Sequence, residues 1–250
     1  MGPDDCAIAL HHIYIHECMA MTVINARLNT FLSLLLPAMP RRTKEDAEIT
    51  RQTILDAAED VFQKQGVANT TLNDIARQAG VTRGAIYWHF DNKLDLFKQM
   101  YNRFHLPIQA LAEQSASAAE SDPLGSYRSL LVLLFRQTVR DPHQRKVLDI
   151  LLLRCEQTEA MGEIVELQTR YYLEAVARTQ KTLENAIRRK QLPSTLDTRR
   201  ASVLLHATIR GLLTNWLLAP EAFKLDEDAE ILVDAALDTL RHTPALQHRH

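Results

Sequence analysis

One short segment constrains this chain more than any other, and it is residues 71–90, TLNDIARQAGVTRGAIYWHF. The apolar residues of its first half share one helix face, and they are Leu72, Ile75, Ala76 and Ala79. Gly80 then ends this helix, and Thr82 is placed to cap a second one. The segment therefore predicts a helix, a tight turn and a helix.

The second helix of this motif is short, and its small residues are Gly84 and Ala85. Its large side chains are expected to point outward. Those outward residues are Arg83, Tyr87, Trp88 and His89. A plain helical hairpin is the alternative, because helix-turn-helix units also occur as packing motifs. Three neighbouring planar side chains are more than one core face can bury, so some must be exposed. Exposed aromatic, imidazole and arginine groups on such a helix favour contact with the DNA major groove.

These residues resemble the DNA-binding signature of the TetR family of one-component repressors, and GVTRGAIYWHF resembles the branch that controls multidrug efflux pumps. The resemblance runs from about Pro40 to the C-terminus, but its specific motifs lie within residues 41–105. The looser matches further along are Arg154-Cys155-Glu156, Gly211 and Trp216-Leu217-Leu218-Ala219-Pro220. It implies an all-α fold and a homodimer on a palindromic operator, with no enzymatic activity.

The resemblance and the helical periodicity divide the chain into three parts. Residues 1–38 are expected to be a disordered extension, dispensable for operator binding, because Met39 begins a family-like start. Residues 39–105 should form a three-helix helix-turn-helix domain for DNA binding. Residues 106–250 should form a larger helical domain for ligand binding and dimerisation.

The extension has two features with other interpretations. Its clustered possible metal ligands are His11, His12, His16 and Cys18, but their spacing fits no standard metal site. Its apolar run, residues 31–36, is short and follows an acidic start at Asp4 and Asp5, unlike a signal peptide or a membrane anchor. No metal, cofactor or membrane association is therefore expected.

The overall charge requires that any DNA-binding surface be local. The chain has 29 Lys and Arg against 31 Asp and Glu, a net charge of −2 at pH 7. Its 3 cysteines, an odd number spread along the sequence, do not form a disulfide framework. A reducing cytoplasm is the expected compartment.

Basic residues around the motif extend the expected DNA interface. An arm of Arg41, Arg42 and Lys44 can reach along the backbone or into a minor groove, a solvated leader being the alternative. Arg51 in the preceding helix and Lys93 in the following one are phosphate candidates. The full expected set is Arg41, Arg42, Lys44, Arg51, Thr71, Thr82, Arg83, Gly84, Ala85, Tyr87, Trp88, His89 and Lys93.

The rest of the chain predicts helices and no strand. Asp122-Pro123 and Asp141-Pro142 mark two helix starts. The expected helices cover about residues 47–65, 92–107, 123–140, 142–156, a long stretch up to 190, 197–218 and 226–241. The last two resemble the pair that forms the four-helix bundle of the dimer in this family.

Residues 147–153 are apolar almost all round their helix, so this helix is expected to be buried. Asp149 and Glu156 beside it then need a partner or a cationic ligand. A salt bridge is the alternative, with candidate partners Arg145, Arg154 and Arg210. The residues expected to bind a ligand are Asp149, Leu152, Cys155, Glu156, His206, Ile209, Arg210 and Trp216. For Trp216, which lies among leucines just before Pro220, a position in the core is the competing prediction. The carboxylates favour a small lipophilic effector that is cationic.

The sequence favours a ligand-responsive repressor of a multidrug efflux operon that leaves its operator when a lipophilic compound binds. A regulator of a metabolic operon and a regulator controlled by a protein partner are the alternatives. An enzyme or a helical small-molecule carrier is the distant alternative, because the chain shows no phosphate-binding glycine loop, metal-ligand spacing or nucleophile elbow.

Overall fold

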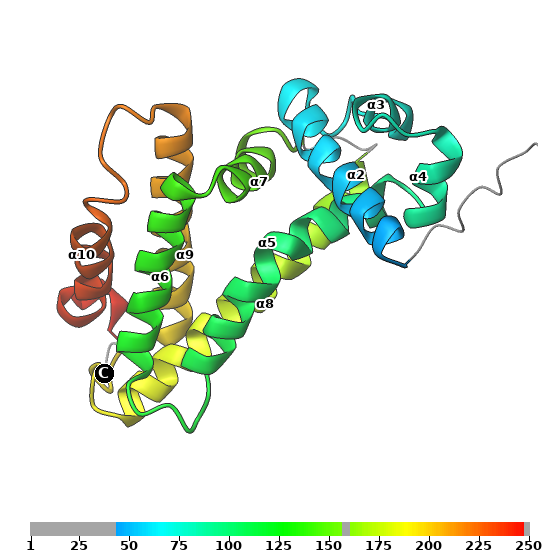
Figure 1. The fold of residues 1–250 in the computed structure, drawn as a ribbon. Helices are drawn as coiled ribbons and strands as arrows, with labels where there is room; N and C mark the ends of the chain where they lie inside the picture. The colour runs from blue at the N-terminus through cyan, green and yellow to red at the C-terminus, as the bar shows by residue number, and fades with distance from the viewer. Residues whose placement is uncertain (1–43, 157–160, 248–250) are drawn as a thin grey trace, which may run out of the picture. The chain divides into compact units, whose positions relative to one another are not determined.

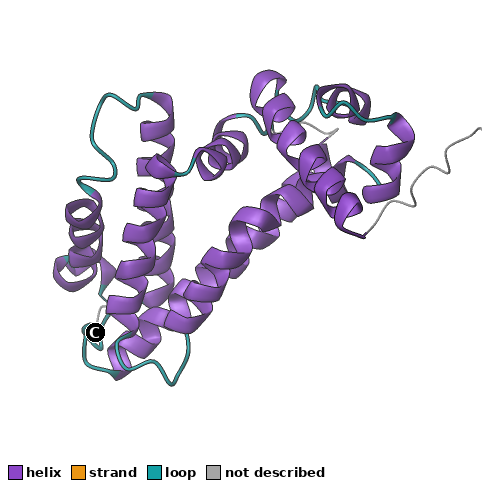
Figure 2. Cartoon of the chain, in the orientation of Figure 1, coloured by secondary structure: helices purple, strands orange, loops and turns teal. Residues whose placement is uncertain are grey.

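The computed structural model describes residues 44–156 and 161–247 (Figure 1). Its elements are α2 (Lys44–Gln65), α3 (Leu72–Gln78), α4 (Arg83–His89), α5 (Lys93–Ser115), α6 (Pro123–Arg140), α7 (Pro142–Leu153), α8 (Gly162–Arg188), α9 (Thr198–Leu218), α10 (Ala229–His242) and the 3-10 helix η2 (Pro244–Leu246). Extended structure in the described ranges is limited to an isolated bridge between Leu196 and Gln247 (Figure 2). The all-α prediction is confirmed. The predicted extension, residues 1–38, lies outside the described residues.

Polar side chains cap the helices where the sequence indicates helix starts. Asn92 Oδ1 accepts the Asp95 N–H at 2.9 Å at the start of α5. Asp122 Oδ1 accepts the Gly125 N–H at 2.9 Å at the start of α6. The side chains that cap α7 and α9 in the same way are Asp141 and Asp197. Local sequence therefore determines where these helices begin.

The ends of α5 and α7 differ from the sequence-based expectation. α5 continues through Pro107 to Ser115. α7 ends at Leu153, before the expected Glu156. The next carbonyl group, that of Arg154, accepts the Val67 N–H at 3.1 Å, so the chain turns towards the loop after α2.

Two hydrophobic cores lie within the unit that begins at Glu48. One contains the motif helices and α2, with Phe62 and Phe97 fully buried, and Ile150 of α7 and Ile164 of α8 also belong to it. The other lies among α6, α8, α9 and α10 and also includes Leu148 of α7. Since α7 and α8 contribute to both cores, packing crosses the predicted boundary near residue 105.

The helices after the motif pack as a layered bundle. α5 and α8 lie side by side, and α6 packs against both (Figure 1). α9 packs against α8 and α7, and α10 packs against α6. In the described part of the chain, no helix is both long and apolar enough to cross a membrane.

Candidate DNA interface and internal cavity

Two N-terminal helix caps and one glycine in the turn define the helix-turn-helix. The Thr71 hydroxyl accepts the Asp74 N–H at 3.2 Å, and Asp74 Oδ2 accepts the Thr71 N–H at 3.0 Å, which closes a capping box on α3. Gly80 makes the turn with a φ of 66°, a conformation that favours glycine. Thr82 caps α4 by accepting the Ala85 N–H at 3.2 Å. The predicted helix, turn and helix are confirmed.

One face of α4 is free for a partner. Ile86 is fully buried and anchors the helix, whereas Tyr87 is 48% and Trp88 is 72% exposed. Arg83 is also exposed, with its guanidinium carbon 5.6 Å from the centroid of the Tyr87 ring. At Gly84 an added Cβ would meet nothing nearer than 3.9 Å. This face therefore offers charge, aromatic surface and room for close backbone approach.

Two other residues predicted to contact DNA have partners within the fold. Arg51 donates to Gln99 Oε1, and its guanidinium carbon lies 5.9 Å from the centroid of the Phe90 ring. The His89 ring packs edge-on against Trp88, with centroids 4.5 Å apart. Both side chains thus support the motif, and their contacts with DNA stay predictions.

The predicted basic arm is only partly described. Arg41 and Arg42 lie outside the described residues, and Lys44 is the exposed first residue of α2. The role of this arm in DNA binding stays a prediction.

Lys93 does not have the free ammonium group that a phosphate contact requires. Its Nζ donates to the carbonyl groups of Val67, Ala68 and Thr70, at 3.0, 3.3 and 3.1 Å. An ammonium group has three donors, so all are used. Burial lowers the pKa of Lys93, and the nearby Glu156 charge opposes this shift. The structure corrects the prediction: Lys93 holds the loop between α2 and α3 against α5.

Replacing Lys93 by methionine should destabilise the protein without changing the salt dependence of DNA binding. Loss of these charged hydrogen bonds is expected to lower the free energy of unfolding by about 1.5 to 3 kcal/mol. The slope of log affinity against log salt should stay unchanged, because it counts neutralised phosphates at about 0.9 for each contact. Urea unfolding and a salt series measure the two effects, with the exposed Lys98→Met on the same helix as control. Unchanged stability with a slope shallower by about two would support the phosphate contact instead.

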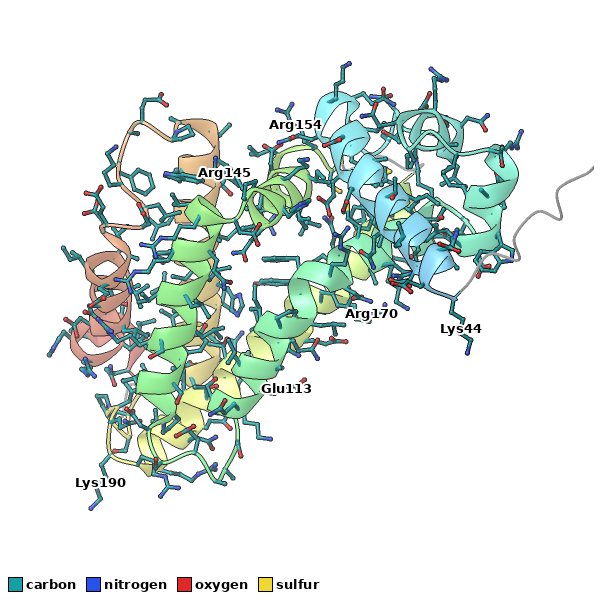
Figure 3. All side chains as sticks on the ribbon, viewed as in Figure 1. Lys44, Glu113, Arg145, Arg154, Arg170 and Lys190 are labelled. Carbon is teal, nitrogen blue, oxygen red and sulfur yellow. The ribbon has the colours of Figure 1, made fainter. Side chains whose placement is uncertain are left out.

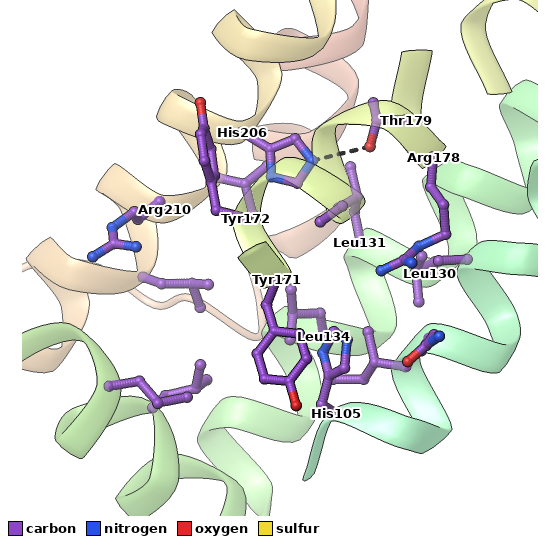
Figure 4. A pocket seen from close by; sticks show the side chains of 18 of the residues that line it. His105, Leu130, Leu131, Leu134, Tyr171, Tyr172, Arg178, Thr179, His206 and Arg210 are labelled. Carbon is purple, nitrogen blue, oxygen red and sulfur yellow. Dashed lines mark hydrogen bonds between the residues drawn. The ribbon is translucent and has the colours of Figure 1, made fainter. Parts of the chain in front are cut away.

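A cavity of about 590 Å³ lies among α5, α6, α7, α8 and α9 (Figure 4). Its lining is largely apolar and aromatic, with few polar groups. Its polar and aromatic lining includes Tyr101, His105, Tyr171, Arg178, Thr179, His206 and Arg210. This size and lining are typical of small-molecule binding sites.

Aromatic rings from α5 and α8 form one wall of the cavity. The rings of Tyr101 and Tyr171 stack with centroids 4.5 Å apart and an interplanar angle of 7°. The His105 ring lies 4.8 Å from that of Tyr101, and its Nδ1 is 3.0 Å from the Tyr101 hydroxyl oxygen. Burial, aided by the Arg178 charge, lowers the pKa of His105 to about 4. His105 is therefore neutral at physiological pH.

The cavity contains some of the residues predicted to bind a ligand, and these are Leu152, His206, Ile209 and Arg210. His206 Nε2 lies 3.0 Å from Thr179 Oγ1, and burial lowers the pKa of this histidine (Figure 4). The predicted residues that do not line the cavity are Asp149, Cys155, Glu156 and Trp216. The contacts of these four side chains elsewhere in the fold explain why they do not line the cavity.

Asp149 and Cys155 are used by the fold itself. The Asp149 carboxylate pairs with Arg154, with 3.5 Å between Oδ2 and Nε, which agrees with the salt-bridge alternative. Burial raises the pKa of Cys155 to about 12, so its thiol stays protonated. Neither side chain faces the cavity, which corrects the prediction of ligand contacts for both.

Glu156 and Trp216 lie near opposite ends of α7. Glu156 Oε2 accepts the Ala68 N–H at 3.1 Å, beside the motif. Trp216 is 5% exposed in the second core, where the Arg145 guanidinium carbon lies 5.3 Å from its ring centroid. Figure 3 shows Arg145 on the α9 side of α7 and Arg154 at its other end, beside α2. Neither Glu156 nor Trp216 lines the cavity, which corrects the prediction of ligand contacts for both.

Sequence reasoning missed the polar and aromatic lining contributed by α5 and α8. Tyr101 and His105 have i, i+4 spacing, and Tyr171 and Arg178 have i, i+7 spacing, so each pair shares a helix face. This periodicity is present in the sequence. It does not show that the two faces meet around a cavity.

Contacts at the loop after α2 join the motif to α7. Val67 and Ala68 donate their N–H groups to the Arg154 carbonyl and to Glu156 Oε2, both at 3.1 Å. Gly66 has a φ of 82°, and an added Cβ there would collide with the Glu156 carboxylate. Gly66 therefore suits the left-handed turn, and its lack of a side chain leaves room for the Glu156 carboxylate.

A buried carboxylate makes a second connection between α2, α5 and α7. Glu59, 1% exposed, accepts from Arg103 at 3.4 Å and lies 3.0 Å from His143 Nδ1. Burial raises the pKa of Glu59, and His143 and Arg103 oppose this shift. Arg103 also donates to Asp56 at 2.8 Å, so the chain itself neutralises this cluster. These contacts therefore connect α5 and α7 to α2.

Comparison with known proteins defines the class to which this two-part arrangement belongs. Residues 54–100 match the family model of bacterial regulatory proteins of the tetR family, and residues 122–242 match that of the C-terminal region of MAATS-type transcriptional repressors. The chain belongs to the TetR family of transcriptional regulators.

Similar proteins include the HTH-type transcriptional regulator TtgR of Pseudomonas putida, which is 46% identical over 209 residues, covering 84% of this chain and 100% of TtgR. The HTH-type transcriptional regulator AcrR of Shigella flexneri is 38% identical over 210 residues, covering 84% and 98%. Among solved structures, NalD, the secondary repressor of the MexAB-OprM multidrug efflux pump in Pseudomonas aeruginosa, is 39% identical, with a TM-score of 0.71 and coverage of 80% and 100%.

Proposed function

We propose that the protein represses an operon for a multidrug efflux pump and leaves its operator when a small lipophilic compound occupies the cavity. The observation that carries this proposal is one helix, α5, that both lines the cavity and holds the motif loop. NalD, similar over its full length, is named as a repressor of such a pump.

DNA binding requires the exposed face of α4, and a homodimer supplies two copies. One short helix reads too few bases to select a site, whereas two can read half-sites about 34 Å apart. The residues proposed to contact DNA from α4 and its cap are Thr82, Arg83, Gly84, Ala85, Tyr87, Trp88 and His89. A palindromic operator follows from the twofold symmetry.

The link from cavity to DNA runs along α5. Tyr101 and His105 face the cavity, and Lys93 at the start of the same helix binds the loop that leads into α3. A ligand that fits one position of α5 better than another shifts the population of the two conformers. Coupling of this kind is typically worth about 1 to 3 kcal/mol.

Selection of bound duplexes from a random library tests the DNA half of the proposal, and the enriched sequences should be palindromic. The ligand half is tested with triclosan, because the similar protein SmeT has been solved as a triclosan complex. Triclosan should lower the affinity for the selected duplex by about 5- to 150-fold. No enrichment, or unchanged affinity when calorimetry shows the cavity saturated, would contradict the proposal.

A further inference from the structure

The charged side chains that line the cavity are cationic. Arg178 of α8 and Arg210 of α9 both belong to the lining. Among the described residues that form it, none is an aspartate or a glutamate. The carboxylates on which the expectation of a cationic effector rests, those of Asp149 and Glu156, face other partners. The electrostatics of the cavity are therefore opposite to those that the sequence suggests.

One guanidinium donor of Arg178 has no partner in the described part of the chain. Its Nε is buried and has no hydrogen-bond partner. Within the described ranges, no carboxylate lies within ion-pair distance of its guanidinium group. Leaving a buried donor of a charged group without a partner is costly. A guanidinium binds a carboxylate or phenolate through charge-assisted hydrogen bonds, so an anionic ligand would remove this cost.

The position of Arg178 places its charge inside the cavity. It lies close enough to His105 on α5 and to His206 on α9 to contribute to the lowered pKa of both. Figure 4 shows Arg178 extending from α8 on the same side of the cavity as His105. The charges of Glu174 and Glu113 act in the opposite direction on the pKa of His105, but neither residue belongs to the cavity lining.

His105 supplies a second donor to the same region. Its Nε2 is buried without a hydrogen-bond partner, while Nδ1 is engaged with the Tyr101 hydroxyl. When that hydroxyl donates to Nδ1, the ring proton of the neutral imidazole lies on Nε2. Arg178 and His105, which both line the cavity, therefore each hold a buried donor without a hydrogen-bond partner beside it.

We infer that the cavity selects aromatic or other apolar ligands that carry one anionic group, and that Arg178 binds this group with His105 as a second donor. The inference rests on the proposed function, because it specifies the class of effector that enters the same cavity. A ligand of this class places its apolar body against the leucines of α6 and α7 and its anion near α5 and α8.

Three matched fluorescent compounds test the inference on the full-length protein, and they are 9-anthracenecarboxylate, 9-anthracenemethanol and 9-anthracenemethylammonium. The carboxylate should bind about 10- to 100-fold more tightly than the alcohol, as expected for a charged hydrogen bond. The ammonium compound should bind most weakly. Equal affinities, or tightest binding of the ammonium compound, would overturn the inference.

Variants separate Arg178 from a general effect of positive charge. Arg178→Met should remove most of the preference for the carboxylate over the alcohol, and Arg178→Lys should retain part of it. Arg170→Met is the matched control, because it removes the same charge from an exposed position of α8 outside the cavity lining. An equal loss in Arg178→Met and Arg170→Met, with both variants folded by circular dichroism, would reject a specific site.

The same titrations, repeated with a bound operator duplex, distinguish failure of this inference from failure of the proposed function. If the alcohol releases the duplex as well as the carboxylate does, effector control holds and anion selection is wrong. If the carboxylate binds selectively and the duplex stays bound, anion selection holds and effector control is wrong.

Discussion

Replacing Trp216 by alanine is expected to lower the free energy of unfolding by about 3 to 5 kcal/mol, the range for a tryptophan removed from a core. The indole is 5% exposed among the core residues of α6, α9 and α10, and Arg145 covers its ring. Truncation would leave a large void and remove the ring against which Arg145 packs. Urea unfolding followed by circular dichroism at 222 nm, a far-UV wavelength that reports helix, measures the change.

The second tryptophan provides the control. Trp88 is 72% exposed, so Trp88→Ala should change the free energy of unfolding by no more than about 0.5 kcal/mol. If Trp216→Ala unfolds at the urea concentration of the parent, Trp216 is not part of the core.

Arg83→Ala should abolish discrimination at one symmetric pair of operator positions. Arg83 is exposed at the start of α4 and can reach a guanine edge in the major groove. Each lost base contact is worth about 1 to 3 kcal/mol, and a dimer loses two. Affinities for the selected operator and for duplexes mutated at each position measure the effect.

Arg77→Ala is the matched control for Arg83→Ala. Arg77 lies on α3 of the same motif, with a side chain 79% exposed. Its loss should weaken all duplexes alike, because it removes charge without removing base contacts. Equal weakening of every duplex by Arg83→Ala would show that Arg83 contacts a phosphate.

The elements that sequence reasoning predicted well are those determined by neighbours in the chain. Thr82, Asp122 and Asp197 cap helices through N–H groups three residues later, and such caps depend on local spacing. The exposure of Tyr87 and Trp88 follows from the limited face that a short helix can bury.

Partners distant in sequence account for the predictions that were wrong. Lys93 binds carbonyl groups of residues 67–70, and Glu156 binds the N–H group of Ala68. From local sequence alone, Lys93 at the start of its helix is compatible with a phosphate contact, and Glu156 beside an apolar helix is compatible with a ligand contact. Their contacts depend on how α5 and the segment after α7 meet the motif, which no local pattern specifies.

The charge of the cavity also depends on tertiary packing. Residues 147–153 are apolar on several faces, so the sequence does not show which face of α7 turns towards the cavity. Leu148, Leu151 and Leu152 line it, whereas Asp149 turns towards Arg154. Arg178 lines the cavity from α8, which is distant in sequence. Its positive charge favours an anionic ligand, whereas the sequence suggested a cationic one.

The central claim is that ligand in the cavity and DNA on α4 oppose each other's binding. Its most direct test is the affinity of 9-anthracenemethanol for the protein, with and without saturating operator duplex. We expect binding to weaken by about 5- to 150-fold in the presence of the duplex, and the alcohol to weaken operator binding by the same factor, because coupling is reciprocal. Ala175→Phe, which fills part of the cavity, should weaken binding of the alcohol measured without operator. Equal affinity of the parent protein for the alcohol with and without operator would contradict the claim.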